Sequence, residues 1–346
     1  MIELKLPAKN AKISLQTVVQ KQFFEAKAQR AEMDGSLDFK WYSLGREGSD
    51  RSCPLPVSFL WEEKDTPETA EIEYYHLLVS ETEDMHKPWV YITKECSYDV
   101  YNLKVGTRYF WCVQKNGKRS EVFSFETLLT LPRFLKVDHI ANVRDIGGYR
   151  VEGGRIRQGL VYRGGEFELH MQLSPAGAEE LRRLGIRTDL DMRAEAEWMN
   201  FATSENIGIR RFYVPSEPYD KVFNKKQRPA LKNFFKPFTI PKNYPIYFHC
   251  WGGADRTGTF AFIIGAFLGM SYEDLIYEYE VTSLAIWGIR SRNYGEFCDF
   301  LELFMNLPGK TLREKSTTFL KKYAGITDKQ LDVVYNILVE KDEIGQ

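Results

Sequence analysis

The sequence lacks several features that define large classes of protein. No segment reaches the roughly 18 consecutive apolar residues that a membrane-spanning helix needs. The five cysteines are odd in number and include no Cys-x-x-Cys pair, which argues against a disulfide framework and against a zinc knuckle. A net charge of −1 offers no general attraction for nucleic acid. We therefore expect a reducing compartment and no metal, cofactor or nucleic-acid partner.

The N-terminus also lacks the basic start and apolar stretch of a secretory leader, since it begins MIELKLP. A cytoplasmic protein is predicted, although a secreted chain whose leader had been removed would look the same. The remaining composition, with 43% hydrophobic and 27% charged residues, is that of a folded globular protein. A length of 346 residues favours two domains over one.

The first part of the chain predicts a β-sandwich. Short strand-like runs alternate with turn signals, a rhythm typical of two packed antiparallel sheets. Asn116-Gly117 suits a tight hairpin turn, so the runs on either side of it are expected to pair. The predicted strands are Val57–Trp61, Tyr74–Ser80, Trp89–Thr93, Tyr109–Gln114 and Val122–Thr127.

An aromatic pattern in this part resembles the fibronectin type III module, a member of the immunoglobulin-like sandwiches. It consists of Trp61 on an early strand and Leu103-x-x-Gly106-Thr107-x-Tyr109. In that module such a tyrosine makes a corner contact before a buried strand. The resemblance implies that residues 1–130 form an accessory domain that binds a protein or carbohydrate partner or shapes the rim of a neighbouring site. A helix near 16–33 has no assigned place in this sandwich.

After Leu131-Pro132 the pattern changes to alternating strands and helices, which predicts an α/β domain with a mostly parallel sheet over residues 131–346. Ser174-Pro175 is a helix start and Gly185 a helix stop. Strands are predicted at 186–192 and 244–249, and a helix at 257–268. A helical C-terminus follows, with further helices expected at 271–287, 293–306, 311–323 and 328–340.

The candidate catalytic and binding residues lie in segment 249–258, between a predicted strand and a predicted helix. Its sequence is His-Cys-Trp-Gly-Gly-Ala-Asp-Arg-Thr-Gly. Loop amides freed by two glycines, together with the positive end of a helix dipole, form an anion cradle. The same groups favour the thiolate of Cys250, which is the nucleophilic form. Arg256 supplies a two-pronged donor for phosphate oxygens. The predicted phosphate-binding residues are Trp251, Gly252, Gly253, Ala254, Thr257 and Gly258, and Thr257 is expected to donate its hydroxyl to the cysteine sulfur.

This loop resembles the active-site loop of the bacterial atypical tyrosine-protein phosphatase family. Further pieces agree in the same order: the segment 142–148 (NVRDIGG), the strand 161–163 (VYR), and Asp191-Met192-Arg193 with Glu197. The resemblance covers roughly residues 136–345. It implies a phosphoric monoester hydrolase that forms a thiophosphate on Cys250. Some members carry a lysine where this chain has Ala254, and that lysine is associated with phosphoinositide hydrolysis.

Two aspartates compete for the role of general acid, which the leaving oxygen requires. Asp255 lies inside the loop, as in other phosphatases with a Cys-x-x-x-x-Asp-Arg loop. Asp191 lies at the end of a predicted strand, where active sites of open α/β sheets form. Asp255 is slightly favoured, and the other aspartate is expected to orient or support the site.

Several nearby residues have both a functional and a structural interpretation. His249 is interpreted as a prop for the loop and not as a proton shuttle. Arg144 and Asp145 either support the site or form a surface pair, and Arg163 and Arg193 either contact phosphate or are solvated or ion-paired. The basic stretch 221–236, interleaved with phenylalanines, is either a mobile lid that recruits acidic or phosphorylated substrate or a solvated amphipathic helix that packs its phenylalanines inward.

The sequence thus predicts a protein tyrosine phosphatase acting on a phosphorylated protein or another phosphomonoester. The alternative within enzymes is a phosphatase of phosphoinositides or other small phosphomonoesters that uses the same residues, and the loss of the loop lysine disfavours lipids. A sulfurtransferase is disfavoured by the loop length. A phosphate-binding adaptor is disfavoured because both Cys250 and Arg256 are present.

Overall fold

The computed structural model describes residues 2–32, 50–64, 73–194, 201–286 and 288–342. The chain divides into two compact units, and it crosses between them three times. The first unit comprises Met1–Thr17 and Pro54–Leu131, and the second comprises Val18–Cys53 and Pro132–Gln346. The domain ranges predicted above, 1–130 and 131–346, stay a prediction.

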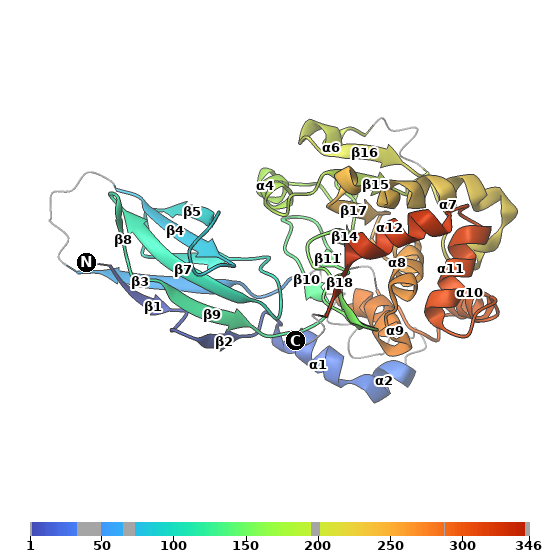
Figure 1. Cartoon of the computed structure of the whole chain (residues 1–346), viewed down its shortest axis with the longest axis horizontal. Helices are drawn as coiled ribbons and strands as arrows, with labels where there is room; N and C mark the ends of the chain where they lie inside the picture. Colours follow the sequence, from blue (N-terminus) through green and yellow to red (C-terminus); the bar gives the residue numbers. More distant parts are fainter. Residues whose placement is uncertain (1, 33–49, 65–72, 195–200, 287, 343–346) are drawn as a thin grey trace. The chain divides into compact units, whose positions relative to one another are not determined.

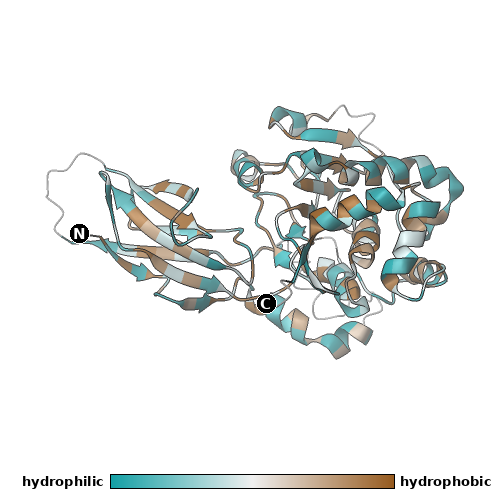
Figure 2. Ribbon diagram, in the orientation of Figure 1, coloured by the Kyte–Doolittle hydropathy of each residue, from teal (hydrophilic) through white to brown (hydrophobic). Residues whose placement is uncertain are grey.

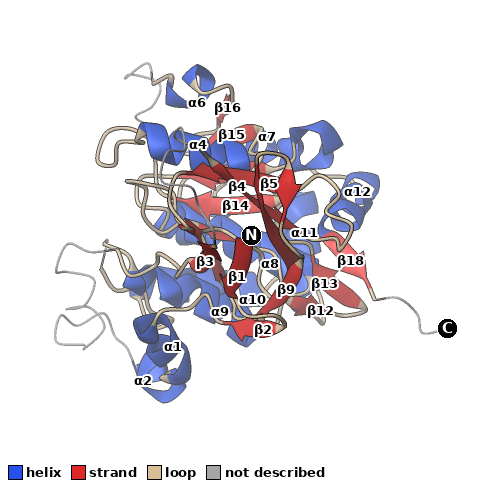
Figure 3. Ribbon diagram, turned by 90° about the vertical axis from the view of Figure 1, so that its left-hand side faces the viewer, coloured by secondary structure: helices blue, strands red, loops and turns tan. Residues whose placement is uncertain are grey.

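The first unit consists of two β-sheets, and its described residues contain no helix (Figures 1 and 3). One sheet has the strand order β1-β3-β6, and the other has the order β2-β9-β7-β4-β5, with β8 paired to β7. The strands are β1 (Ile2–Leu6), β2 (Ala11–Ile13), β3 (Val57–Glu63), β4 (Tyr75–Ser80), β5 (Trp89–Thr93), β6 (Ser97–Val100), β7 (Arg108–Lys115), β8 (Lys118–Arg119) and β9 (Phe123–Thr127).

The two sheets share one hydrophobic core, because alternate side chains of both point inward. The alternation is visible along the strands in Figure 2. Trp61 and Tyr109 are buried in this core, and the Tyr109 hydroxyl accepts a hydrogen bond from the amide of Lys104 at 2.8 Å, which is the predicted corner contact. The predicted pairing of β7 with β9 is confirmed, and both residues of the Asn116-Gly117 turn have positive φ.

The second unit is built on a mixed sheet with the order β10-β11-β14-β17-β15-β16. The last four strands in this order are mutually parallel, whereas β11 pairs antiparallel with both β10 and β14. A small sheet, β12-β13-β18, lies apart from it. The strands are β10 (Arg133–Phe134), β11 (Arg144–Asp145), β12 (Arg150–Val151), β13 (Gly154–Ile156), β14 (Val161–Gly164), β15 (Thr188–Asp191), β16 (Arg210–Tyr213), β17 (Ile246–His249) and β18 (Val339–Lys341).

Two helices of this unit begin at capping residues where the sequence predicted a helix start. Ser174 caps α4 through the amide of Gly177, and Thr311 forms a capping box with Glu314 at α11. Helix α8 packs against β14 and β17 (Figure 1). The α-helices are α1 (Val18–Glu25), α2 (Lys27–Glu32), α4 (Pro175–Arg183), α6 (Thr203–Asn206), α7 (Arg228–Phe235), α8 (Asp255–Leu268), α9 (Tyr272–Glu280), α10 (Gly295–Met305), α11 (Leu312–Lys322) and α12 (Asp328–Leu338). The 3-10 helices are η1 (Tyr219–Phe223), η2 (Lys225–Gln227), η3 (Lys236–Thr239), η4 (Pro241–Asn243) and η5 (Val281–Leu284).

Three helical predictions needed correction. The helix expected at 16–33 is two helices, α1 and α2, and both belong to the second unit. The helix expected from 271 to 287 ends at Glu280 and continues as the 3-10 turn η5. The last helix ends at Leu338, because Val339–Lys341 pairs with β13 instead.

A buried ion pair ties α2 to α9. Arg30 donates to the Glu280 carboxylate at 3.2 Å, and both side chains are almost fully buried. The guanidinium also lies over the ring of Tyr277, 4.7 Å from its centre, and Phe23 of α1 packs beside that ring. These contacts make α1 and α2 part of the hydrophobic core of the second unit.

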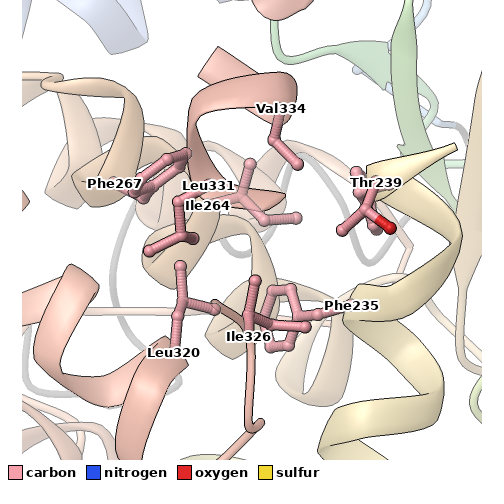
Figure 4. Close-up of a pocket in the computed structure, with 9 residues that line it drawn as sticks. Phe235, Thr239, Ile264, Phe267, Leu320, Ile326, Leu331 and Val334 are labelled. Carbon is pink, nitrogen blue, oxygen red and sulfur yellow. The ribbon is translucent and has the colours of Figure 1, made fainter. Parts of the chain in front are cut away.

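The C-terminal helices close over α8 around a small apolar cavity of about 20 Å³ (Figure 4). That volume has room for about one water molecule, so the cavity is a packing feature and not a ligand site. It is lined by Phe235, Phe238, Thr239, Ile264, Phe267, Leu320, Ile326, Leu331 and Val334.

The basic stretch at 221–236 is an amphipathic segment running through η1, η2 and α7. Its lysines are exposed, whereas Phe234 and Phe235 are buried and pack on Phe260 of α8. The structural interpretation of this stretch therefore accounts for its phenylalanines. Among the helices of the described residues, none is long and apolar enough to cross a bilayer.

Candidate active site

Cys250 lies between the carboxyl end of β17 and the start of α8, at the centre of the sheet. Carboxyl ends of parallel strands are where open α/β sheets hold their ligands. The thiol is 4% exposed, and the loop from Gly252 to Ala254 is buried with it. Helix α8 begins at Asp255, so its unpaired N-terminal amides adjoin the loop.

Four consecutive carbonyl groups of this loop are bound from behind. The Cys250 carbonyl is 2.8 Å from the His249 ring nitrogen Nδ1, and the Trp251 carbonyl accepts from the amide of Glu166 at 2.9 Å. The carbonyls of Gly252 and Gly253 accept from the Asn142 amide group at 3.0 and 3.1 Å.

In a trans peptide the N–H points opposite to the preceding C=O. The amides of residues 251–254 are therefore turned toward the other side of the loop. In the part of the chain that the structure describes, the amides of Gly252, Gly253 and Ala254 donate to no other backbone group. This arrangement can receive an oxyanion.

Gly253 is required by its conformation and by its surroundings. Its φ is +65°, which favours glycine, and a Cβ atom there would lie 2.3 Å from the carbonyl oxygen of Gly164. The loop thus runs in direct backbone contact with the end of β14. Any larger residue at this position would displace the cradle.

A buried ionic cluster supports the loop from β11 and β14. Arg163 donates to the Gly253 carbonyl and to the Glu278 carboxylate, each at 2.5 Å. Arg144 donates to the other oxygen of Glu278 at 2.6 Å and also to the side chain of Asn142. Burial, together with the nearby charge of Arg144, lowers the pKa of Arg163 to about 10. Arg144 and Arg163 are thus ion-paired supports of the cradle.

Asp145, which the sequence suggested as a partner of Arg144, is equally buried. Asp145 accepts from Arg133 at 2.8 Å and from the amides of Gly147 and Gly159 at 2.7 and 2.6 Å. The interpretation of Arg144 and Asp145 as a surface pair is therefore wrong, since both side chains are fully buried.

Arg256 and Thr257 follow in the first turn of α8. Arg256 is half-buried, and its guanidinium donates to the carbonyl of Met192, just beyond the end of β15, at 3.1 Å. The Thr257 hydroxyl is buried and makes no hydrogen bond to a described residue, the Cys250 sulfur included. Gly258 is buried against the ring of Tyr279.

Asp191, one of the two candidate acids, is enclosed. Arg193 donates to both of its carboxylate oxygens, at 2.9 and 2.8 Å, and neither side chain is more than 1% exposed. Burial alone would raise the pKa of Asp191, but the charges of His249 and Arg193 outweigh it and hold this pKa below its usual range. Glu197, which belongs to the same sequence element, lies outside the described residues.

Asp255, the other candidate, is more accessible, since its side chain is 37% exposed. Arg290 binds both of its oxygens, at 2.6 and 2.9 Å, and the Tyr219 hydroxyl donates to one of them. Burial would raise the pKa of Asp255, but Arg290 and Tyr219 outweigh it and lower this pKa. Accessibility and a place inside the loop distinguish Asp255 from Asp191.

His249 is a buried cation behind the loop. Its ring nitrogen Nε2 lies 3.1 Å from the Asp189 carboxylate, and both side chains are 1% exposed. Burial alone would lower the pKa of His249, but the carboxylates of Asp189 and Asp191 raise it to about 9. His249 is therefore protonated at neutral pH and holds the Cys250 carbonyl as a prop.

This raised pKa predicts a pH-dependent stability. Protonation of His249 stabilises the fold fully below pH 6.5, and the contribution disappears as the pH rises through about 9. From pH 6.5 to about 9, the free energy of unfolding should decrease in the wild type. This decrease should exceed that of His249→Gln by up to about 3 kcal/mol. Urea unfolding at a series of pH values measures this, with the same substitution at the exposed His139 as the control. Parallel curves for wild type and His249→Gln would contradict the assignment.

Several residues that support the site were not predicted from the sequence. Glu278 of α9, Tyr219 of η1 and Arg290, beyond η5, reach the loop from segments distant in sequence. Glu166 bonds the loop backbone, and it also accepts from Arg193 at 2.6 Å and from His170. Arg163 and Arg193 were considered only as possible phosphate contacts or ion pairs, and the ion-paired interpretation is correct for both.

The sequence of the second unit is similar to those of known phosphatases. The model of the tyrosine phosphatase family matches residues 135–340. A curated protein of Cupriavidus necator, named "Putative tyrosine-protein phosphatase", is 30% identical over 173 residues, which are 42% of this chain and 61% of that protein. The chain thus spans about three fifths of the length of that curated relative.

Similar solved structures include the catalytic core of the PP-IP phosphatase SIW14 from S. cerevisiae, at 21% identity and a TM-score of 0.28, covering 36% of this chain and 71% of that one. The kinase associated phosphatase KAP follows at 13% identity and a TM-score of 0.23, covering 51% and 84%. A fibronectin type III domain of the human KIAA0970 protein shares 27% identity at a TM-score of 0.19, covering 21% and 64%. Because the family model matches more than half of the chain, this protein belongs to the tyrosine phosphatase family.

Proposed function

We propose that the protein is a protein tyrosine phosphatase that hydrolyses phosphate monoesters through a thiophosphate on Cys250. The observation that carries this proposal is the set of four loop carbonyls, from Cys250 to Gly253, that are hydrogen-bonded from behind, which leaves the following amides facing the other side. Such an arrangement binds a phosphate dianion beside a buried thiol. Membership of the tyrosine phosphatase family supports it.

The reaction proceeds in two steps. The Cys250 thiolate attacks phosphorus, the bond to the leaving oxygen breaks, and an aspartic acid gives that oxygen its proton. Water then attacks the thiophosphate, the same aspartate takes a proton from the water, and the thiolate leaves with inorganic phosphate as product. Arg256 and the amides of residues 251–254 hold the non-bridging oxygens throughout. The unpartnered hydroxyl of Thr257 can donate to the departing sulfur.

We assign the general acid to Asp255 and a positioning role to Asp191. A proton donor must reach the leaving oxygen and solvent, and only Asp255 of the two has an accessible side chain. Its lowered pKa means that this acid is mostly ionised at neutral pH. Activity on esters with poor leaving groups should therefore increase as the pH falls below neutrality.

Asp255→Asn is expected to lower kcat on a phosphotyrosine peptide about 10²–10³-fold, because the leaving tyrosine then departs without a proton. The loss should be much smaller on difluoromethylumbelliferyl phosphate, whose leaving group is a weak base. Asp191→Asn is the matched control, and it should lower both activities by the same factor. If the loss in Asp191→Asn were instead large on the phosphotyrosine peptide and small on the ester with the weakly basic leaving group, the two roles would be reversed.

The rim of the site favours an aromatic ester. Trp251, the residue after the nucleophile, is partly exposed, and its ring lies 4.6 Å from the ring of His170. His170 is held in turn by the Glu166 carboxylate, 2.9 Å from its ring nitrogen Nδ1. A phenyl phosphate can pack against such a surface, whereas an inositol ring gains little from it. Ala254, in place of the lysine found in some members of the family, adds no charge for a lipid headgroup.

The experiment is phosphate release, with a chelator present, from three substrates at equal concentration: a phosphotyrosine peptide, the same peptide with phosphoserine, and dispersed phosphoinositides. We expect the phosphotyrosine peptide to have the highest kcat/KM. Preference for the lipid would establish the alternative, a phosphoinositide phosphatase using the same loop. Release from none of the three would leave a binding role or a different small phosphomonoester.

We also propose that the first unit is a fibronectin type III-like accessory domain that binds a protein or carbohydrate partner. Its two sheets around one core and the Tyr109 corner contact support this. The catalytic domain would then be residues 131–346 together with the segment Val18–Cys53. The test is to measure whether a protein or a carbohydrate ligand binds the full chain. An accessory role predicts binding that leaves the phosphatase activity unchanged.

A further inference from the structure

We infer that Ser52, far outside the part of the chain that matches the family model, positions the catalytic loop through Asn142. The family model begins at residue 135, and the longer segment of the first unit, Pro54–Leu131, lies between Ser52 and that residue in the sequence. The inference rests on the proposed function, because it assigns a positioning residue to that site. It requires only contacts within the second unit.

Two hydrogen bonds in series connect Ser52 to the loop. The Asn142 backbone amide donates to the Ser52 hydroxyl oxygen at 3.1 Å. The Asn142 side chain donates to the carbonyls of Gly252 and Gly253 at 3.0 and 3.1 Å. Ser52 is 1% exposed and Asn142 is fully buried, so water does not replace either contact.

Asp50 sets the direction of the Ser52 hydroxyl. The hydroxyl donates its single proton to the Asp50 carboxylate at 2.6 Å, and the Ser52 amide donates to the same oxygen at 2.9 Å. A hydroxyl has a single proton, so once it donates that proton to one group it can only accept hydrogen bonds from its other neighbours. Ser52 therefore acts as an acceptor toward Asn142.

The segment around Ser52 is anchored on both sides. The Arg51 amide donates to the carbonyl of Leu284 in η5 at 2.9 Å. Gln20 of α1 donates to the carbonyls of Arg51 and Cys53, each at 2.9 Å. These bonds hold the hydroxyl in place relative to the sheet, which is what a positioning contact requires.

Asn142 depends on this contact because its backbone is in an uncommon conformation. Its φ is +64°, and its amide hydrogen has the Ser52 hydroxyl as an acceptor and also interacts with the Asp50 carboxylate beside it. Loss of the Ser52 hydroxyl removes one acceptor and one of the groups that orient Asp50, so Asn142 would shift toward the carboxylate that remains. Its side chain would then release the loop carbonyls, and the amides that face the phosphate would lose their common direction.

The test compares Ser52→Ala with Ser316→Ala in the full chain. Ser316 is also fully buried, and its hydroxyl donates to the Ile263 carbonyl within α8 at 2.7 Å, away from the loop. Ser52→Ala loses the hydrogen bonds to Asp50 and from Asn142, and Ser316→Ala loses one buried hydrogen bond. We expect Ser52→Ala to bind inorganic phosphate about 3- to 10-fold more weakly, by calorimetry, and to lose kcat by a similar factor. Ser316→Ala should keep both values, and Ser52→Thr, which retains the hydroxyl, should restore them.

All variants are compared at a temperature below the unfolding temperature of each. If Ser52→Ala does not fold, Ser52→Cys replaces it, since a thiol of similar shape is only a weak acceptor and should give an intermediate loss. Equal phosphate affinities for Ser52→Ala and Ser316→Ala would overturn the inference. Phosphate binding by a wild type that hydrolyses no ester would refute the proposed function alone, because the affinity comparison would still decide the role of Ser52.

Discussion

Cys250→Ser is expected to lower kcat on a phosphotyrosine peptide at least about 10⁴-fold, because a serine hydroxyl is not ionised near neutral pH and is the weaker nucleophile. The cradle itself does not depend on the sulfur. Its amides are aligned by Asn142, Glu166 and His249, and these contacts persist in the variant. Affinity for inorganic phosphate should therefore stay within about threefold of wild type.

Single-turnover kinetics and phosphate calorimetry on the same preparation separate the two effects. Rapid quenching in acid should trap phosphate on wild-type protein and none on Cys250→Ser. Residual activity within about tenfold of wild type would contradict the thiolate mechanism. Loss of phosphate binding together with activity would indicate instead that the substitution disturbs the loop.

Gly253→Ala should produce the second largest loss, at least about 100-fold in kcat/KM. A methyl group at this position would lie 2.3 Å from the Gly164 carbonyl oxygen, and 2.4 Å from its carbon, so backbone must move on one side or the other. A displacement of about 1 Å in a catalytic loop is enough for a loss of this size. Phosphate affinity should fall as well, because Gly253 carries one of the amides that face the phosphate.

Gly185→Ala is the matched control, since Gly185 also has a left-handed backbone, with φ of +72°, but nothing lies within 4 Å of its added Cβ. Both substitutions should destabilise the fold by about 1 kcal/mol through backbone strain. Only Gly253→Ala should lose activity when the two are assayed well below their unfolding temperatures. Similar activities in the two variants would show that the contact with Gly164 does not position the loop.

The sequence predicted the loop because its chemistry is contiguous. Cys250, the glycines, Asp255 and Arg256 lie within seven residues, and the strand and helix that flank them have plain apolar patterns. The strands of the sandwich were found for the same reason, since their alternation is local. The cap Thr311 carries its own signal in Glu314, three positions later, and the cap Ser174 in the proline that follows it.

The supports of the loop could not be predicted in this way. Ser52, Glu278 and Arg290 are ordinary polar residues whose partners lie far along the chain, and no local pattern announces a tertiary hydrogen bond. The short strands β1 and β2 were missed because their pairing with β3 and β9 supplies the stability that their few residues lack. The proposed choice of Asp255 over Asp191 as the general acid rests on solvent exposure, which the sequence does not contain.

The interleaved order of the two units has a consequence for synthesis on the ribosome. Arg30 buries its charge against Glu280, which follows 250 residues later. At a synthesis rate of roughly 5 to 20 residues per second, Glu280 follows the N-terminal helices after roughly 10 to 50 s. Phe23 and Arg30 remain uncovered during this time. During that interval the sandwich can already close, since its last strand ends at Thr127. The segment that carries Ser52 therefore emerges early and reaches its place under the catalytic loop only when the chain is nearly complete.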